Sequence, residues 1–218
     1  MGQLIYLDKR RSERSPLASV TQPLFCFDVS CPLSYLTAER IERKLGAVEW
    51  VPVDAASLRA VADQGSLVAQ RDDLVLRRRA DSCARALRLP LVWPDRFPEA
   101  ARCAQRASAF ACELGAGAAF ALAASRLAFC GGFDLEDPET LAEAAAAAGL
   151  PLEECLSAAG EAWRDEELET NADLLRAHGI SELPAIRIGD QWFEGEAGLL
   201  AAGAMSAGPP TVRRLAPV

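Results

Sequence analysis

Histidine is nearly missing from this chain, which has one among 218 residues, and none of its seven cysteines is followed by another three positions later. Common zinc sites need cysteine and histidine ligands clustered at short spacings, so we expect no metal centre. The odd number of scattered cysteines also argues against a complete disulfide framework. We expect most of them to be small buried thiols in a reducing compartment.

Long apolar runs and dense basic clusters are lacking as well. No apolar stretch reaches the length of about 18 residues that spans a membrane. No hydrophobic segment of a secretory signal follows the basic residues between positions 9 and 14. The formal net charge is −8, and no basic stripe is present that could neutralise many phosphates. We therefore expect a cytoplasmic protein that binds neither nucleic acid nor membranes.

Half of the residues are hydrophobic, which is enough for a sizeable core. The apolar run 24–29 has the length and composition of a buried strand. Pro32 suits the first turn of a helix, the spacing of small and apolar residues over 32–45 is helical, and Gly46 is placed to end it. A second strand is expected over 48–53. The first part of the chain thus predicts a β-α-β unit.

The middle of the chain, 55–171, is rich in alanine, arginine, glutamate and leucine. Stripes at helical spacing recur there, and they predict four to six helices and no strand. Strand signals return at 185–188 and 191–194, on either side of a Gly-Asp pair typical of hairpin turns. A short helix is expected over 199–204.

The order of these elements predicts an α/β fold that is interrupted by a large all-helical insertion. The mixed sheet and its helices would form a discontinuous domain from residues 22–55 and 172–205. Residues 56–171 would form the inserted helical domain. Residues 1–21 and 206–218 are expected to be flexible arms.

Cys31 is the candidate reactive residue, because it lies between a buried strand and the start of a helix. Unpaired backbone N–H groups and the helix dipole stabilise a thiolate at that place, and the thiolate is the nucleophilic form. The alternative is an inert small residue in a turn. Ser34 stands three residues later, where a second thiol would be needed to resolve a mixed disulfide. Its hydroxyl can donate a hydrogen bond to the sulfur, or it simply completes the first helical turn.

Two further residues have alternatives that the residues themselves leave open. Asp28 is an acid in a buried strand, and it is either a satisfied structural group or a proton relay. Pro184 precedes the strand that begins at Ala185. Taken alone it is an ordinary strand-start proline, because cis is the minority state of any X-Pro bond.

The run from residue 27 to 36, Phe-Asp-Val-Ser-Cys-Pro-Leu-Ser-Tyr-Leu, resembles the active-site segment of the DsbA-like branch of the thioredoxin superfamily. It is closest to the 2-hydroxychromene-2-carboxylate isomerases and the kappa-class glutathione transferases. Segments 89–94 and 179–184, and the Phe-Glu-Gly at 193–195, are similar to later motifs of that family. The resemblance covers about residues 23–203. It implies a thioredoxin-like fold with a large helical insertion after the first β-α-β unit.

The resemblance also implies roles for single residues. Cys31, followed by Pro32, falls where the isomerases have a serine that contacts the glutathione sulfur, and equally where DsbA has its attacking cysteine. The bond between Leu183 and Pro184 would be cis and would face Cys31. The backbone of Leu183 would then pair with the cysteinyl part of glutathione or of a peptide.

One departure concerns the family's aspartate that holds the γ-glutamyl amine. Ala197 takes its place here, and we expect Glu196 next to it to substitute. The polar loop expected after the second strand is also shortened, to residues 54–58.

Three functions follow, and we prefer the first. The protein would be a thiol–disulfide oxidoreductase that works through Cys31 alone, with glutathione or another thiol as the resolving partner. Alternatively, it would be a glutathione-dependent isomerase or transferase acting on a small aromatic acid, with Cys31 and Ser34 orienting the glutathione sulfur. The third is a non-catalytic binding protein that keeps the fold. The question of a homodimer is left open.

Overall fold

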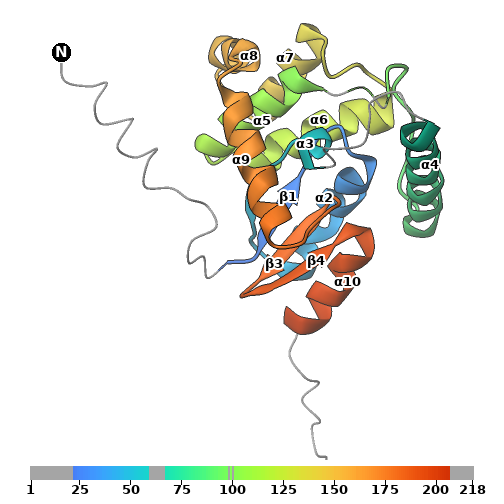
Figure 1. Cartoon of the computed structure of the whole chain (residues 1–218). Helices are drawn as coiled ribbons and strands as arrows, with labels where there is room; N and C mark the ends of the chain where they lie inside the picture. The colour runs from blue at the N-terminus through green and yellow to red at the C-terminus, as the bar shows by residue number, and fades with distance from the viewer. Residues whose placement is uncertain (1–21, 59–66, 98, 100, 207–218) are drawn as a thin grey trace, which may run out of the picture.

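The structure is a computed structural model that describes residues 22–58, 67–97, 99 and 101–206 (Figure 1). Nearly all of the predicted arms, 1–21 and 206–218, therefore lie outside the described residues. The described part is a mixed α/β structure in which a small sheet is covered by helices. This confirms the predicted fold class.

A four-stranded sheet forms from the two ends of the described chain. Its strands are β1 (Leu24–Phe27), β2 (Glu49–Pro52), β3 (Ala185–Ile188) and β4 (Gln191–Glu194), in the order β2-β1-β3-β4. β1 pairs in parallel with β2 and antiparallel with β3, and β3 and β4 form an antiparallel hairpin. Every residue of β1 is buried, as its uninterrupted apolar sequence predicts.

Helix α2 (Pro32–Leu45) connects β1 to β2 and has the predicted bounds. Proline is its first residue, where the missing N–H costs no helical hydrogen bond. Gly46 ends it with φ +76°, a conformation that few other residues adopt without strain. The helix buries Leu36 and Ile41 completely.

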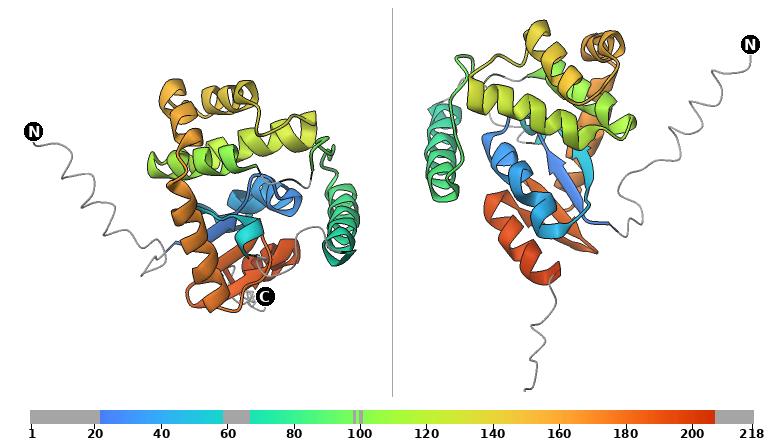
Figure 2. Two further views of the ribbon diagram at one scale, coloured as in Figure 1. Left: turned by 45° about the horizontal axis from the view of Figure 1, so that its top comes forward. Right: turned by 180° about the vertical axis from the view of Figure 1, so that it is seen from behind.

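The inserted region contains more helices than the four to six expected, and no strand occurs in the part of it that the structure describes. Helices α5 to α8 gather at one end of the sheet, whereas α4 stands at the margin of the molecule beside α2 (Figure 2). The boundary predicted between residues 171 and 172 lies inside one continuous helix. The helices are α3 (Ala55–Leu58), α4 (Leu67–Leu87), α5 (Arg102–Glu113), α6 (Gly117–Gly131), α7 (Pro138–Ala147), α8 (Leu152–Gly160) and α9 (Arg164–Ala177).

The last helix, α10 (Gly195–Ser206), begins earlier than the predicted 199–204. Three glycines in this segment lower its intrinsic helix propensity, so its sequence signal is weak. Its stability comes instead from packing against α2 and β3, which buries Leu199 and Ala202 completely.

The core extends from the sheet into the helical region. Phe25, Phe27 and Trp50 pack edge to face or stacked within the sheet layer, with Phe25 and Trp50 ring centroids 4.8 Å apart. Tyr35 of α2 stacks on Phe129 of α6 at 5.7 Å. Among the described helices, none is both long and apolar enough to cross a bilayer.

Candidate functional site

Cys31 lies at the N-terminal end of α2, against the loop that leads into β3. Its Sγ is 3.8 Å from the backbone oxygen of Leu183, 152 positions away, and the bond between Leu183 and Pro184 is cis. β1 and β3 are antiparallel neighbours, with Cys26 opposite Ala185. The end of β1 and the start of β3 therefore lie at the same end of the sheet, and the loops that follow β1 and precede β3 come together there.

Burial raises the pKa of the Cys31 thiol, and the nearby Asp28 carboxylate raises it further. Hydrogen bonds from the backbone and hydroxyl of Ser34 and from the backbone N–H of Leu33 lower that pKa. The N–H groups at the start of α2 thus favour the thiolate form of Cys31. The expected net lowering of the pKa is wrong, because only 8% of Cys31 is exposed and desolvation outweighs these hydrogen bonds.

Ser34 is buried in the first turn of α2, one turn beyond Cys31. Its hydroxyl oxygen accepts a hydrogen bond from the backbone N–H of Asp28 at 3.3 Å, and the same hydroxyl interacts with the Cys31 sulfur. Ser34 therefore completes the helical turn and also lies at the sulfur. A catalytic role for it stays a prediction.

Asp28 is a fully satisfied buried group. Its Oδ1 accepts hydrogen bonds from the backbone N–H and the hydroxyl of Ser30, both at 2.7 Å. Its Oδ2 accepts from the backbone N–H of Ala55 and from Gln105 Nε2, both at 2.9 Å. Burial nevertheless raises the pKa of Asp28. The carboxylate joins the loop before Cys31 to α3 and α5, which favours the structural interpretation over a proton relay.

Gln105, a partner of Asp28 that lies 77 positions away, was not predicted from the sequence. Its amide nitrogen also donates to Asp54 Oδ1 at 3.4 Å, so it bridges two buried carboxylates. Its Oε1 has no hydrogen-bond partner within the part of the chain that the structure describes. The only sequence signal is a polar residue between Ala104 and Arg106 in α5, which is too weak to identify such a bridge.

The loop before β3 is held from two sides. Arg79 of α4 donates two hydrogen bonds to the carboxylate of Glu182, at 2.6 and 2.9 Å. The side chain of Glu194 accepts from the backbone N–H of Ser181 and, at 3.3 Å, from that of Glu182. From the sequence, the short basic run that contains Arg79 indicates a solvated helix face. The structure places this one arginine beside the Cys31 loop.

Glu196 belongs to the first turn of α10 and faces inward. Arg40 of α2 donates to its Oε1 at 2.5 Å, and both side chains are mostly buried. Burial, together with a hydrogen bond to Glu196, raises the pKa of the Cys83 thiol to about 12. The Glu196 carboxylate is therefore engaged within the protein. The predicted contact of this residue with a ligand stays a prediction.

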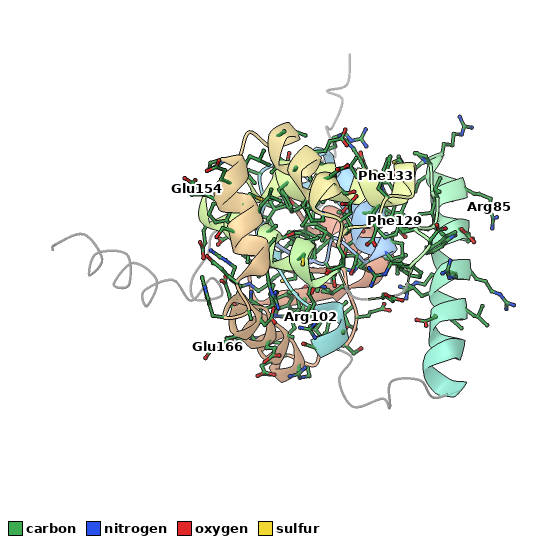
Figure 3. All side chains as sticks on the ribbon, turned by 90° about the horizontal axis from the view of Figure 1, so that it is seen from above. Arg85, Arg102, Phe129, Phe133, Glu154 and Glu166 are labelled. Carbon is green, nitrogen blue, oxygen red and sulfur yellow. The ribbon has the colours of Figure 1, made fainter. Side chains whose placement is uncertain are left out.

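A small cavity of about 30 Å³ opens beside Ser30, the residue before Cys31. Phe97, Phe129 and Phe133 line it together with Arg96, and the two phenylalanines at the end of α6 lie close together in Figure 3. Nearby, the Tyr35 hydroxyl donates to the Pro90 oxygen at 3.1 Å.

The cysteines are all within the described residues, and all are free thiols. Cys130 is exposed, contrary to the expectation that it packs in the helical core, and its Sγ lies 3.2 Å from the Tyr35 hydroxyl. Across the described ranges, no cluster of three histidine, cysteine, aspartate or glutamate residues is arranged to hold a metal ion.

Comparisons with known proteins add a family and a fold. The family described as the DSBA-like thioredoxin domain matches residues 24–201. Curated protein sequences give no significant match. Among solved structures, a 2-hydroxychromene-2-carboxylate isomerase superposes with a TM-score of 0.69 at 15% identity, covering 85% of this chain and 94% of that one. A probable DsbA oxidoreductase from Streptomyces coelicolor gives 0.66 at 21% identity, covering 89% and 93%.

Proposed function

The chain belongs to the DSBA-like thioredoxin domain family, as its motifs predict, and we propose that it is a thiol–disulfide oxidoreductase that works through Cys31 alone. The resolving partner is an external thiol, such as glutathione. One observation carries the proposal: the Cys31 sulfur lies between the N–H groups at the start of α2 and the backbone oxygen of Leu183.

The proposed reaction has two exchanges. Cys31 loses its proton to solvent, and its thiolate attacks one sulfur of a disulfide R–S–S–R′. A bond forms between Cys31 and the R sulfur, and R′–S⁻ leaves with the electron pair of the broken bond. An external thiolate then attacks the R sulfur and releases reduced Cys31. The external thiol is needed because Ser34 stands where a resolving cysteine would be, and a hydroxyl cannot attack a disulfide in this way.

The neighbours of the sulfur suit this chemistry. The N–H groups of Leu33 and Ser34 stabilise the thiolate when it forms and when it leaves. Pro184 has no N–H to compete for the sulfur. The backbone of Leu183 is placed to pair with an extended thiol ligand, as an added strand would. Pro32 keeps the first turn of α2 free of an unused donor.

The test follows glutathione attachment to each cysteine. The folded protein is treated with glutathione disulfide at alkaline pH, because the raised pKa of Cys31 delays thiolate formation. Peptide mapping should then show an adduct on Cys31 that is released by reduced glutathione, besides any adduct on the exposed Cys130. Cys31→Ser should abolish the adduct at position 31 and all turnover of a small disulfide. Cys130→Ser, which removes the exposed thiol, is the matched control and should leave turnover unchanged.

Turnover that survives in Cys31→Ser would refute the proposal. So would a folded wild-type protein that forms no Cys31 adduct at any pH at which it stays folded. That second outcome would favour the non-catalytic function.

A second candidate is the glutathione-dependent isomerase, which the burial of the Cys31 thiol specifically favours. In this function Cys31 stays a thiol, as its raised pKa favours, and donates a hydrogen bond to the thiolate of bound glutathione. The cavity beside Ser30 measures only about 30 Å³, so an aromatic acid would enter it only after the surrounding side chains move. Calorimetry with reduced glutathione at millimolar concentration is the deciding measurement, and an absence of binding heat would exclude this candidate.

A further inference from the structure

We propose that Arg79 is the receptor for a carboxylate group of the thiol or disulfide substrate, and that Glu182 occupies this receptor in the ligand-free protein. The inference rests on the proposed function of Cys31 and names the substrate class of the same site: small thiols and disulfides that carry a carboxylate. Arg79 would be a specificity-determining residue supplied by the inserted helical region.

The position of the ion pair along the loop supports this role. Glu182 is the residue directly before Leu183, and the Leu183 oxygen meets the Cys31 sulfur. The Arg79 guanidinium also lies within electrostatic range of the Cys31 sulfur. We expect a carboxylate a few carbon atoms from a sulfur bound at Cys31 to reach it.

The geometry of the pair shows what Arg79 recognises. Its Nη1 and Nη2 donate to the two carboxylate oxygens of Glu182 at 2.6 and 2.9 Å, one bond to each oxygen. A guanidinium fork of this kind matches a planar carboxylate and binds it with defined orientation. The Glu182 side chain thus shows how the carboxylate of a ligand would bind.

Exposure separates this pair from the other ion pair near the site. The side chains of Arg79 and Glu182 are each 41% exposed, whereas those of Arg40 and Glu196 are only 12% and 16% exposed. Exposed ion pairs contribute little to stability, because water and salt screen them. Glu182 can therefore turn away into solvent and yield Arg79 to an incoming carboxylate, while the buried pair stays closed.

Gly195 leaves room for the guanidinium next to the backbone. A Cβ at this position would collide with Arg79 Nη2 and with Glu182 Oε1. The N–H of Gly195 donates to the Pro184 oxygen at 2.7 Å, which ties the same spot to the cis-proline loop. The fork is thereby held over the backbone between the loop and the start of α10.

Electrostatics couples the receptor to the sulfur. The hydrogen bonds with Glu182 are the largest cause of the raised pKa of Arg79, and a Cys31 thiolate raises that pKa further. The attraction is mutual, so the guanidinium also favours the thiolate. When a ligand carboxylate replaces that of Glu182, the local charge is unchanged and the sulfur keeps its environment.

The experiment compares an anionic and a neutral disulfide of similar size, 3,3′-dithiodipropionate and bis(3-hydroxypropyl) disulfide. For the full-length protein at one alkaline pH, the rate of Cys31 modification is measured with each, and their ratio is the selectivity for carboxylate. Arg79→Gln should lower this ratio about 10-fold, equivalent to about 1.4 kcal/mol. Arg79→Lys keeps the charge but not the two parallel N–H donors, so its selectivity ratio should lie between those of wild type and Arg79→Gln. Glu182→Gln should raise the ratio about 3-fold, because it removes the competing carboxylate.

Arg85→Gln is the matched control, since Arg85 lies on the same helix, carries the same charge and points away from the molecule into solvent (Figure 3). It should change the ratio less than 2-fold. An equal drop for Arg85→Gln and Arg79→Gln would show a general charge effect and overturn the inference. A selectivity ratio that changes in the same direction for Arg79→Gln and Glu182→Gln would also overturn the inference. It would show that the ion pair only anchors α4 to the loop.

Different results would overturn the carboxylate receptor at Arg79 and the oxidoreductase function of Cys31. Unselective but normal reaction of wild-type Cys31 with both disulfides, unaltered in Arg79→Gln, overturns the carboxylate receptor and leaves the oxidoreductase intact. A folded wild-type protein that reacts with neither disulfide overturns the oxidoreductase and the receptor with it.

Discussion

Replacing Asp28 with asparagine removes one charge from the buried loop before Cys31. It also places the new NH₂ group opposite two hydrogen-bond donors that now bind the carboxylate. The carboxylate accepts four hydrogen bonds, two at each oxygen. The asparagine oxygen can keep both bonds from Ser30. Its NH₂ group then faces the backbone N–H of Ala55 and the amide nitrogen of Gln105, neither of which can accept.

The two lost bonds are not equivalent. The oxygen of Gln105 lacks a partner, so its amide can turn over and accept from the new NH₂ group. The N–H of Ala55 loses the carboxylate oxygen to which it donates. A hydrogen bond to a charged group contributes about 1.5–3 kcal/mol, so we expect Asp28→Asn to lower the free energy of unfolding by about 2 kcal/mol at pH 7.

The pH dependence tests the direction of the Asp28 pKa. Because burial raises that pKa in the folded protein, the folded state binds the proton more tightly than the unfolded state. Wild type therefore gains stability as pH falls from its folded pKa toward the unfolded value of about 3.9, and the asparagine variant does not. The stability gap between them should widen as pH falls.

Urea unfolding followed by far-UV circular dichroism measures the gap at pH 7, 6, 5 and 4. Asp190→Asn, in the exposed turn between β3 and β4, is the matched control and should stay within about 0.5 kcal/mol of wild type. A gap that closes on acidification would refute the argument, because it would mean that hydrogen bonding outweighs burial at Asp28. A loss below 0.5 kcal/mol at pH 7 would show that Ala55 finds another acceptor.

Three further predictions concern other parts of the molecule. Asp165→Asn removes the charge and one of the two oxygens that accept 2.7 Å hydrogen bonds from Arg106, and it should cost about 1–2 kcal/mol at pH 7. Since the pairing lowers the Asp165 pKa, this stabilisation is present above about pH 3.9 and is lost as pH falls through the folded pKa, so the difference from wild type should shrink on acidification below that pH. Gly195→Ala forces φ +66° on a residue with a Cβ and should lower the Tm by about 3–6 °C in a calorimetric scan, and an unchanged Tm would contradict the assigned backbone. Cys130 should be alkylated by a maleimide well before the buried Cys155, and peptide mapping that finds the reverse order would contradict the packing of α6 and α8.

Local signals determined the elements that are correctly predicted. Within a helix, proline fits the first turn and not the interior, and glycine readily follows the last turn. The bounds of α2 therefore follow from Pro32 and Gly46. The Gly-Asp pair at 189–190 likewise defines the β3–β4 hairpin. The predicted start of α10, residue 199, lies four residues after the observed start at Gly195, because the glycines of this helix weaken its local signal. Its burial against α2 is a contact between distant segments.

Local residues are enough to predict that Cys31 directly precedes a helix after a buried strand, and motif resemblance pointed to Pro184 as its neighbour. The environment of that sulfur depends on how distant segments pack around it. The pKa of Cys31 is raised rather than lowered because desolvation depends on all the elements packed around it. Arg79 and Glu182 are 103 positions apart, and no local pattern encodes their pairing. Helix starts and turns are set by backbone preferences of adjacent residues, whereas burial and charge pairing arise only when separate elements meet.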